Sequence, residues 1–160
     1  MCSCDQRSTG VSLLKKTAMK LSSQTRYAIR ILFELAGTRT PLPIAELSRR
    51  TGISLRTVEN ICSILRYDGI SSSLAGPGGG MALELDMSEI SLGRLVDLFE
   101  DGVQFSVCCG DKANDCPNME LCENRAIWRR VSAKLQAELD SIALSSLMLR
   151  YASLHPLVKE

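Results

Sequence analysis

Apolar side chains recur at helical spacing in the first part of the chain. Between residues 23 and 36 they follow one another at intervals of three and four, and Gly37 stands where such a helix would end. A second, shorter pattern begins at Pro43 and runs to residue 50, and Gly52 follows it. Glycine tolerates positive φ and therefore favours the end of a helix. The pattern predicts two helices, with a tight turn after the second.

Ser54 stands at the start of a third apolar pattern and is a suitable N-cap, because its side-chain oxygen can accept a backbone N–H of the first turn. Two short helices joined by a glycine-containing turn form a helix-turn-helix. The stripe that would pack inward on the third helix consists of Val58, Ile61, Cys62 and Leu65.

Short β-like runs follow at residues 70–74 and 81–85, separated by the sequence Ala-Gly-Pro-Gly-Gly-Gly. This arrangement predicts a β-hairpin with a glycine-rich tip. The same glycine run is compatible with a phosphate-binding loop, but the Lys-Ser/Thr ending of such loops is missing and no suitable helix follows. A helix-turn-helix followed by a hairpin indicates a winged helix that binds DNA.

Beyond the hairpin, Ser88 or Ser91 is placed to cap a fourth helix, and the longest apolar stripe runs from Trp128 to Leu149. This stripe predicts one long helix that a small domain cannot bury alone, so pairing with a second copy, a homodimer, is expected. The fold class is mostly α with a small β-hairpin. We expect a flexible N-terminal extension (1–18), a winged helix-turn-helix DNA-binding domain (19–101), a cysteine-rich loop (102–124), a dimerisation helix (125–149) and a tail (150–160).

The charge of the chain is divided between its two parts. The formal net charge is +1, but residues 1–75 carry a net +6 and residues 76–160 a net −5. A basic half suits a polyanionic partner such as nucleic acid, although solvated helix faces produce the same imbalance. With 45% hydrophobic and 23% charged residues, the 160-residue chain fits one compact globular unit with an extension.

No transmembrane segment is predicted, because the most apolar stretch, residues 142–149, is interrupted by two serines and is far shorter than about 20 residues. The first eighteen residues lack the pattern of a secretory signal. We therefore expect a cytoplasmic protein that uses no membrane. In a reducing compartment, clustered thiols are more often metal-binding or redox-active than disulfide-bonded.

Four of the seven cysteines fall within fifteen residues, directly before the long C-terminal helix. Thiolates gathered in a loop suit a soft metal ion or an iron–sulfur cluster. The candidate ligands are Cys108, Cys109, Cys116 and Cys122.

The predicted third helix carries polar side chains opposite its apolar stripe. Arginine pairs with guanine, asparagine with adenine, and glutamate accepts from cytosine, so Glu59 is assigned to specificity and not to affinity. Arg49, Arg50 and Arg66 are expected to meet phosphates, which fix position and make binding salt-sensitive. For any single one of these residues, solvation of an exposed face is an equally good explanation. The candidate DNA-binding residues are Ser54, Arg56, Thr57, Glu59, Asn60, Arg66, Gly78 and Gly79, and Ser63 shares the outward face.

Several motifs in order resemble a known family. They are Met19-Lys-Leu-Ser, Arg26-Tyr-Ala, Gly52-Ile-Ser-Leu, the Gly76-Pro-Gly-Gly-Gly wing, and Cys116 and Cys122 followed by Ala126-Ile-Trp. From Met19 to about Met148 the chain is similar to the winged-helix regulators of the IscR, NsrR and RirA type, bacterial dimeric transcription factors that sense through iron–sulfur clusters. The order and spacing of these motifs make the resemblance specific.

The resemblance implies a homodimer, a double-stranded operator and a cluster held by three cysteines. Cys116 and Cys122 match the second and third of these, and the first is Cys109 or Cys108, which the resemblance does not decide. Arg125 stands where 2Fe-2S members have a histidine, and a guanidinium does not bind iron. A 4Fe-4S cluster is therefore expected in preference to a 2Fe-2S cluster, with three cysteines or with both cysteines of the doublet.

Two further departures concern other parts of the resemblance. Arg26 replaces the carboxylate with which nitric-oxide-sensing members complete the site of the partner subunit, and Ala75 replaces a wing arginine, which weakens the case for a minor-groove contact. His155, Cys2 and Cys4 are assigned no role, and Cys62 is assigned to the core.

Two other functions remain open. A cluster-free regulator would use the same cysteines for zinc or for reversible thiol–disulfide chemistry, although their spacing suits zinc poorly. A redox enzyme is the third possibility, but the sequence shows no second cofactor motif and no acid–base or nucleophile set, so we expect a protein that is not an enzyme.

Overall fold

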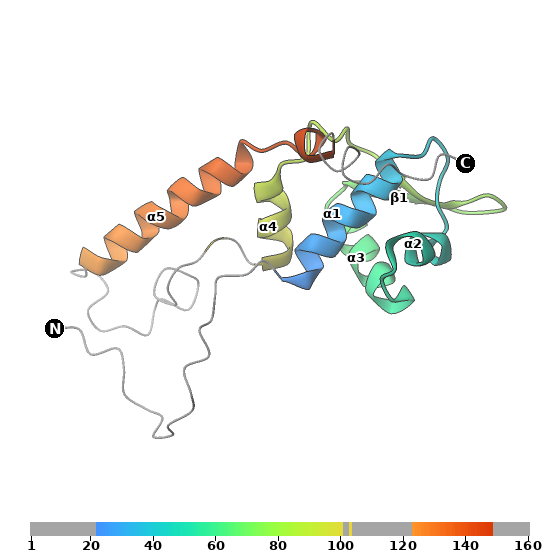
Figure 1. Ribbon diagram of the computed structural model, residues 1–160, viewed down its shortest axis with the longest axis horizontal. Helices are drawn as coiled ribbons and strands as arrows, with labels where there is room; N and C mark the ends of the chain where they lie inside the picture. The colour runs from blue at the N-terminus through green and yellow to red at the C-terminus, as the bar shows by residue number, and fades with distance from the viewer. Residues whose placement is uncertain (1–21, 101–102, 104–122, 149–160) are drawn as a thin grey trace, which may run out of the picture.

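The structure is a computed structural model that describes residues 22–100, 103 and 123–148. Figure 1 shows a mostly helical molecule with one two-stranded hairpin, which confirms the expected fold class. None of the helices in these residues is long and apolar enough to cross a membrane. In chain order the elements are α1 (Ser23–Ala36), α2 (Ile44–Thr51), α3 (Leu55–Tyr67), β1 (Ser71–Leu74), β2 (Gly80–Leu83), α4 (Leu92–Glu100) and α5 (Glu123–Asp140).

The boundaries of the first three helices follow local chemistry. The Ser22 hydroxyl accepts the backbone N–H groups of Gln24 (3.1 Å) and Thr25 (3.4 Å) and so caps α1. Gly52 ends α2 with a φ of 66°, in the left-handed region that glycine adopts without strain. The Ser54 hydroxyl accepts the backbone N–H of Thr57 (3.3 Å) at the start of α3. The expected helix-turn-helix is confirmed, with a cap or a glycine at each of these boundaries.

The hairpin is anchored to the loop between α1 and α2. Strands β1 and β2 pair in antiparallel register from Ser71 opposite Leu83 to Leu74 opposite Gly80. Met81 of β2 also exchanges two backbone hydrogen bonds with Leu42, at 2.8 and 2.9 Å. Strand β2 is therefore held on both sides, by β1 and by Leu42 of the loop between α1 and α2.

The core is aliphatic and joins the helix-turn-helix to α4. Fully buried side chains come from each of the first four helices and from the hairpin base, which places one continuous core behind the third helix. Because the chain has few aromatic residues, branched aliphatic side chains supply most of this burial. The largest of them are Ile31, Leu32, Leu47, Ile61, Leu65, Ile70, Ile90, Leu95 and Leu144.

The expected continuous helix over residues 125–149 is wrong. Helix α5 ends at Asp140, and residues 144–148 form a separate short helical segment. Between them the chain pairs with the residues before α4, where the Leu92 N–H donates to the Ile142 carbonyl (2.8 Å) and the Leu144 N–H donates to the Ile90 carbonyl (2.9 Å). Leu144 is completely buried. The apolar stripe is therefore divided between two elements, and its last part packs into the core of the winged domain.

Helix α5 projects from the winged domain and contacts α4 (Figure 1). At this contact the Gln136 amide donates to the Asp97 carboxylate at 2.9 Å. Nearer the start of α5, Ile127, Trp128 and Val131 keep 56, 43 and 38% of their surface exposed. Such large apolar side chains at helical spacing give this part of α5 an apolar face that is open to solvent.

Candidate nucleic-acid interface

Helix α3 separates an apolar and a polar face. Val58, Ile61, Cys62 and Leu65 are buried, as the sequence predicted, and they fix the rotation of the helix about its axis. On the opposite side Arg56, Glu59 and Asn60 are exposed, and Thr57 is half-buried. The packing thus places on one exposed face the side chains whose chemistry suits base edges.

Two of the candidate residues are tied to each other. The Ser54 and Thr57 hydroxyls lie 2.7 Å apart and share a hydrogen bond, in addition to the cap that Ser54 makes with the Thr57 backbone. Both hydroxyls thus have a structural role at the first turn of α3. Among the described residues, Arg56, Glu59 and Asn60 make no side-chain hydrogen bond of this kind, so their polar groups remain available to a ligand.

The exposed face of α3 borders an open cleft of about 620 Å³. Arg56, Thr57, Glu59 and Asn60 line one side, and Gln24 of α1 lines the other. Sequence reasoning missed Gln24, because nothing local indicates that the first turn of α1 lies beside a helix that begins some thirty residues later. The apolar stripe of α1 predicts a core-facing helix, but not which end of it meets α3.

Two arginines expected to meet phosphates are paired within the protein. The Glu46 carboxylate accepts hydrogen bonds from Arg49 (2.6 and 2.8 Å) and from Arg50 (2.7 Å). The hydrogen bonds from Arg49 and then Arg50 lower the pKa of Glu46 to about 2, and the same contact raises the pKa of Arg49. The three groups together present a single net positive charge. Arg66, in contrast, is exposed at the last turn of α3.

The glycines of the wing are explained by its geometry. Gly78 has a φ of 80°, which disfavours any side chain. A Cβ on Gly79 would lie 2.2 Å from the Leu74 carbonyl oxygen of the same hairpin. These glycines close the turn, and a role for them in DNA contact stays a prediction. Around them the tip is exposed, including Leu74 at 52%.

The cysteine segment lies outside the described residues, as do His155, Cys2 and Cys4, so Cys108, Cys109, Cys116 and Cys122 are known only from their sequence. Within residues 22–100, 103 and 123–148 no three His, Cys, Asp or Glu side chains are placed to hold a metal ion. Cys62 lies in the core, as expected, where burial raises the pKa of its thiol to about 11. It is a packing residue and not a reactive one.

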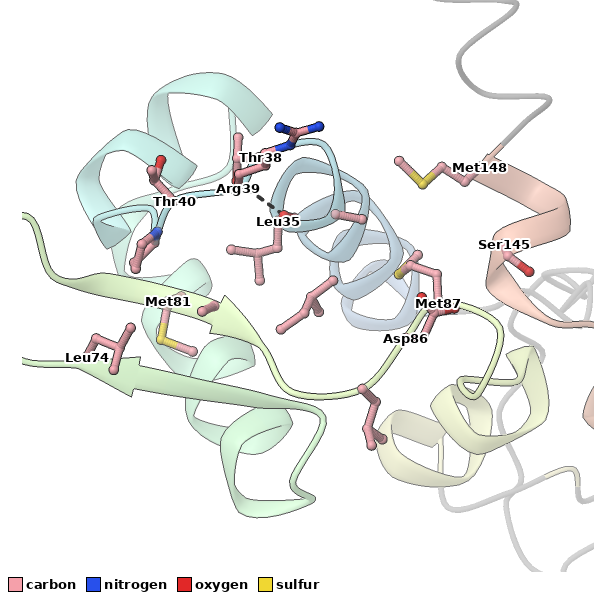
Figure 2. Close-up of a pocket in the computed structure, with 15 residues that line it drawn as sticks. Leu35, Thr38, Arg39, Thr40, Leu74, Met81, Asp86, Met87, Ser145 and Met148 are labelled. Carbon is pink, nitrogen blue, oxygen red and sulfur yellow. Dashed lines mark hydrogen bonds between the residues drawn. The ribbon is translucent and has the colours of Figure 1, made fainter.

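A second, larger hollow lies away from the polar face of α3. Figure 2 shows this groove of about 760 Å³, lined by Leu35, Met81, Met87 and Met148 among others. The Thr38 hydroxyl donates to the Leu35 carbonyl (3.2 Å) at its edge. None of the residues predicted to bind DNA lines it. Its lining is mainly aliphatic and methionine, which is not the chemistry of a DNA-binding surface.

A helix-turn-helix whose second helix presents a polar face, followed by a hairpin wing, defines a winged-helix DNA-binding regulator. The chain belongs to the Rrf2 family, described as "Iron-dependent Transcriptional regulator", which it matches over residues 21–150. The membership agrees with the regulator type that the sequence motifs resemble.

The relatives of the chain carry the names of regulators. It is 36% identical over 132 residues to the HTH-type transcriptional regulator IscR of Aliivibrio salmonicida (strain LFI1238), covering 81% of this chain and 77% of that protein. IscR of Escherichia coli O139:H28 is also 36% identical over 132 residues, covering 81% of this chain and 80% of its own. These relatives are bacterial transcriptional regulators and not enzymes.

Solved structures share the fold. The IscR structure from T. potens superposes with a TM-score of 0.65 at 22% identity, covering 91% of this chain and 96% of its own. CymR (YrzC), the global cysteine regulator of B. subtilis, superposes with a TM-score of 0.62 at 24% identity, covering 83% of this chain and 98% of its own. At these identities the likeness establishes the architecture and leaves the signal open.

Proposed function

We propose that this transcriptional regulator senses iron–sulfur status, redox state or nitric oxide through a cluster held by its cysteines. The observation that carries the proposal is the group of four cysteines within fifteen residues, in a chain of a family described as iron-dependent regulators. Thiolates are the preferred ligands of such clusters. As a bacterial regulator that reads DNA, it would work in the cytoplasm, where these thiols stay reduced.

Cys116, Cys122 and either Cys109 or Cys108 would hold the cluster, with 4Fe-4S preferred over 2Fe-2S. The donor set fits, because all four residues offer soft thiolates and six or seven residues separate the first from Cys116. When bound, the cluster supplies sensitivity to oxidants, nitric oxide and iron supply. Arg125 lies within α5 and a guanidinium does not bind iron, so we assign the cluster either three cysteine ligands or a fourth ligand from the second cysteine of the doublet.

We assign the exposed apolar face of α5 to a homodimer interface. Ile127, Trp128 and Val131 lie at helical spacing and would be covered by the same face of a second copy. A two-fold symmetric dimer presents two copies of α3 to one operator, and the spacing between them must match two half-sites of the DNA. The cysteines lie in the sequence between α4 and α5, so binding of a cluster there would alter that spacing.

On the DNA, Arg56, Asn60 and Glu59 would read bases, whereas Ser54, Thr57 and the wing residues Gly78 and Gly79 would position the duplex. Arg66 would contact phosphate. The support is the exposed face of α3, which the core fixes against rotation. Arg56→Ala should relax the preference at one operator position by about 1–3 kcal/mol, and Arg66→Ala should weaken all sequences alike. If Arg56→Ala lost the same affinity for the operator as for random duplexes, a base-reading role of Arg56 would be contradicted.

The cluster is tested by anaerobic purification and reconstitution, followed by visible absorption and Mössbauer spectroscopy. The parent and Cys62→Ala, a matched control in the core, should develop the same chromophore, whereas Cys116→Ala and Cys122→Ala should lose it and stay folded. Separate Cys108→Ala and Cys109→Ala variants identify the first ligand. A parent that stays colourless and iron-free after reconstitution would refute the proposal.

A second candidate is thiol-based sensing without a cluster. Its support is the fold shared with CymR, the global cysteine regulator of B. subtilis, whose Staphylococcus aureus counterpart has been solved in an oxidised form. The same four cysteines would then form a reversible disulfide or bind zinc. Metal analysis and mass spectrometry distinguish these outcomes, since oxidation of two thiols to a disulfide lowers the mass by two hydrogen atoms and zinc gives no visible absorption.

A further inference from the structure

The first turn of α1 is anchored to the last residue of α4. Thr25 is a polar residue with no exposed surface, and its hydroxyl donates to Oε1 of Glu100. The backbone N–H of Ser22 donates to the same oxygen at 2.7 Å. Burial raises the pKa of Glu100, but the hydrogen bonds from Thr25 and Ser22 outweigh it and hold the pKa below its usual range. An ionised carboxylate therefore ties two helices together.

The anchored turn is the one that faces α3, the helix proposed to read bases and called the recognition helix below. Gln24 lies between the two residues that contact Glu100, and it lines the cleft of about 620 Å³ opposite Arg56 and Asn60. Arg56 and Asn60 are four residues apart on α3 and so share a face. A glutamine amide offers both a donor and an acceptor, the pattern that pairs with the edge of adenine or bonds to a phosphate.

We propose that Gln24 contacts DNA beside Arg56 and Asn60, and that Glu100 is the positioning residue that holds it there. The inference rests on the recognition face assigned above and adds to it a residue from another helix. It does not require the cluster. Because Glu100 is the last residue of α4, the stretch of sequence that carries the cysteines begins directly after the residue that orients Gln24.

The contact is tested with the full chain and the duplex that it selects from a random library, by fluorescence anisotropy at two salt concentrations. Gln24→Ala should weaken binding about tenfold, in line with the loss of one base or phosphate contact. The matched control is Ser23→Ala, which alters an exposed neighbour that does not line the cleft. Parent-like affinity of Gln24→Ala would overturn the proposal.

Arg56→Ala, measured in parallel, separates this inference from the recognition face on which it rests. If Arg56→Ala loses affinity and Gln24→Ala does not, the inference fails alone. If neither variant loses affinity, the assigned face fails as well.

The positioning role is tested with Thr25→Val, which keeps the volume of the side chain and removes its hydroxyl, and with Thr25→Ser, which restores the hydroxyl. Thr25→Val should weaken DNA binding, and Thr25→Ser should recover it. In the double variant with Gln24→Ala, Thr25→Val should cause little further loss, because it acts through Gln24. Losses that multiply would overturn the positioning role. Glu100→Gln provides the same comparison if Thr25→Val does not fold.

Discussion

Arg94 holds Asp68, the residue that ends the recognition helix. Its Nε lies 2.8 Å from the Asp68 carboxylate and its Nη2 lies 2.9 Å from the Asp68 carbonyl oxygen, so one guanidinium satisfies both the side chain and the helix end. Arg94 itself belongs to the first turn of α4, where its backbone N–H donates to the Ser91 hydroxyl (3.1 Å). The orientation of α3 is therefore coupled to α4.

Removal of this contact should destabilise the domain. Arg94→Ala should lower the free energy of unfolding by about 1–2 kcal/mol, since both side chains are only partly exposed and a helix-end carbonyl loses its partner. The free energy of unfolding of Arg94→Lys should lie between those of the parent and of Arg94→Ala, because an ammonium does not reproduce the two-point geometry of the guanidinium. Urea unfolding measures both, with Arg129→Ala on α5 as the control. An unchanged midpoint for Arg94→Ala would contradict the coupling.

The pairing of Glu46 should limit the affinity of the protein for phosphates. Glu46→Gln frees Arg49 and Arg50, so DNA binding should tighten and the slope of log affinity against log salt should steepen by about one. The pKa of Glu46 is lowered from 4.5 to about 2, so the pairing contributes above the unfolded-state pKa and is lost only as the pH falls towards about 2.

Glu138→Gln is the matched control for this prediction, because it removes the same charge from an exposed position of α5. Binding titrations at several salt concentrations compare the two variants. An equal effect of both substitutions would show that only the net charge matters, and not the pairing of the two arginines.

The close approach of the hairpin to the α1–α2 loop should make Gly80 intolerant of a side chain. A Cβ at this position would lie 2.3 and 2.4 Å from the Leu42 carbonyl carbon and oxygen, which are backbone atoms. Gly80→Ala should therefore cost about 1–3 kcal/mol of stability by pushing the wing away from the loop. Gly37→Ala, whose Cβ would stand 3.4 Å from its nearest neighbour at a helical φ of −75°, should change stability little. Thermal unfolding of both variants tests the prediction, and similar effects would contradict it.

Cys62 should be inert in the folded protein. Burial raises the pKa of its thiol to about 11, so at neutral pH the reactive thiolate is almost absent and the sulfur is also inaccessible. Because the folded pKa is raised, the thiol stays protonated in the fold when the unfolded chain already ionises, and stability falls as the pH rises from about 9 towards 11. Iodoacetamide labelling with peptide mapping should modify Cys62 only in denaturant. Rapid modification in native buffer would show that the recognition helix opens.

Local sequence predicted the helix-turn-helix well, because its boundaries depend on residues within it. Ser22 and Ser54 cap their helices with their own hydroxyls, Gly52 ends α2 in a left-handed conformation, and the spacing of the apolar residues fixes which face of α3 is buried. The hairpin followed equally from its glycine-rich turn. Of the two serines considered for the cap of α4, the hydrogen bond to Arg94 selects Ser91.

The C-terminal stripe was misjudged because helical spacing does not show what each part of a stripe contacts. Trp128 and Leu144 continue the same apolar pattern, yet Trp128 is 43% exposed on α5 and Leu144 is completely buried in the winged domain. The helix is interrupted between Trp128 and Leu144, because Ala143 pairs through its backbone with Ser91, which is distant in sequence. Such a long-range pairing leaves no local signal.

The sequence by itself determined the helix-turn-helix and the hairpin, the family motifs and the set of thiols available to bind a cluster, because each depends on residue type and short-range spacing. Only the tertiary structure placed Gln24 beside Arg56, paired Arg49 and Arg50 with Glu46, and tied Glu100 to Thr25. Two of these three relationships join segments more than thirty residues apart, and the third depends on side-chain conformations on one helix face. The packing of the core decides them, because it fixes how the helices are rotated and which of their ends meet.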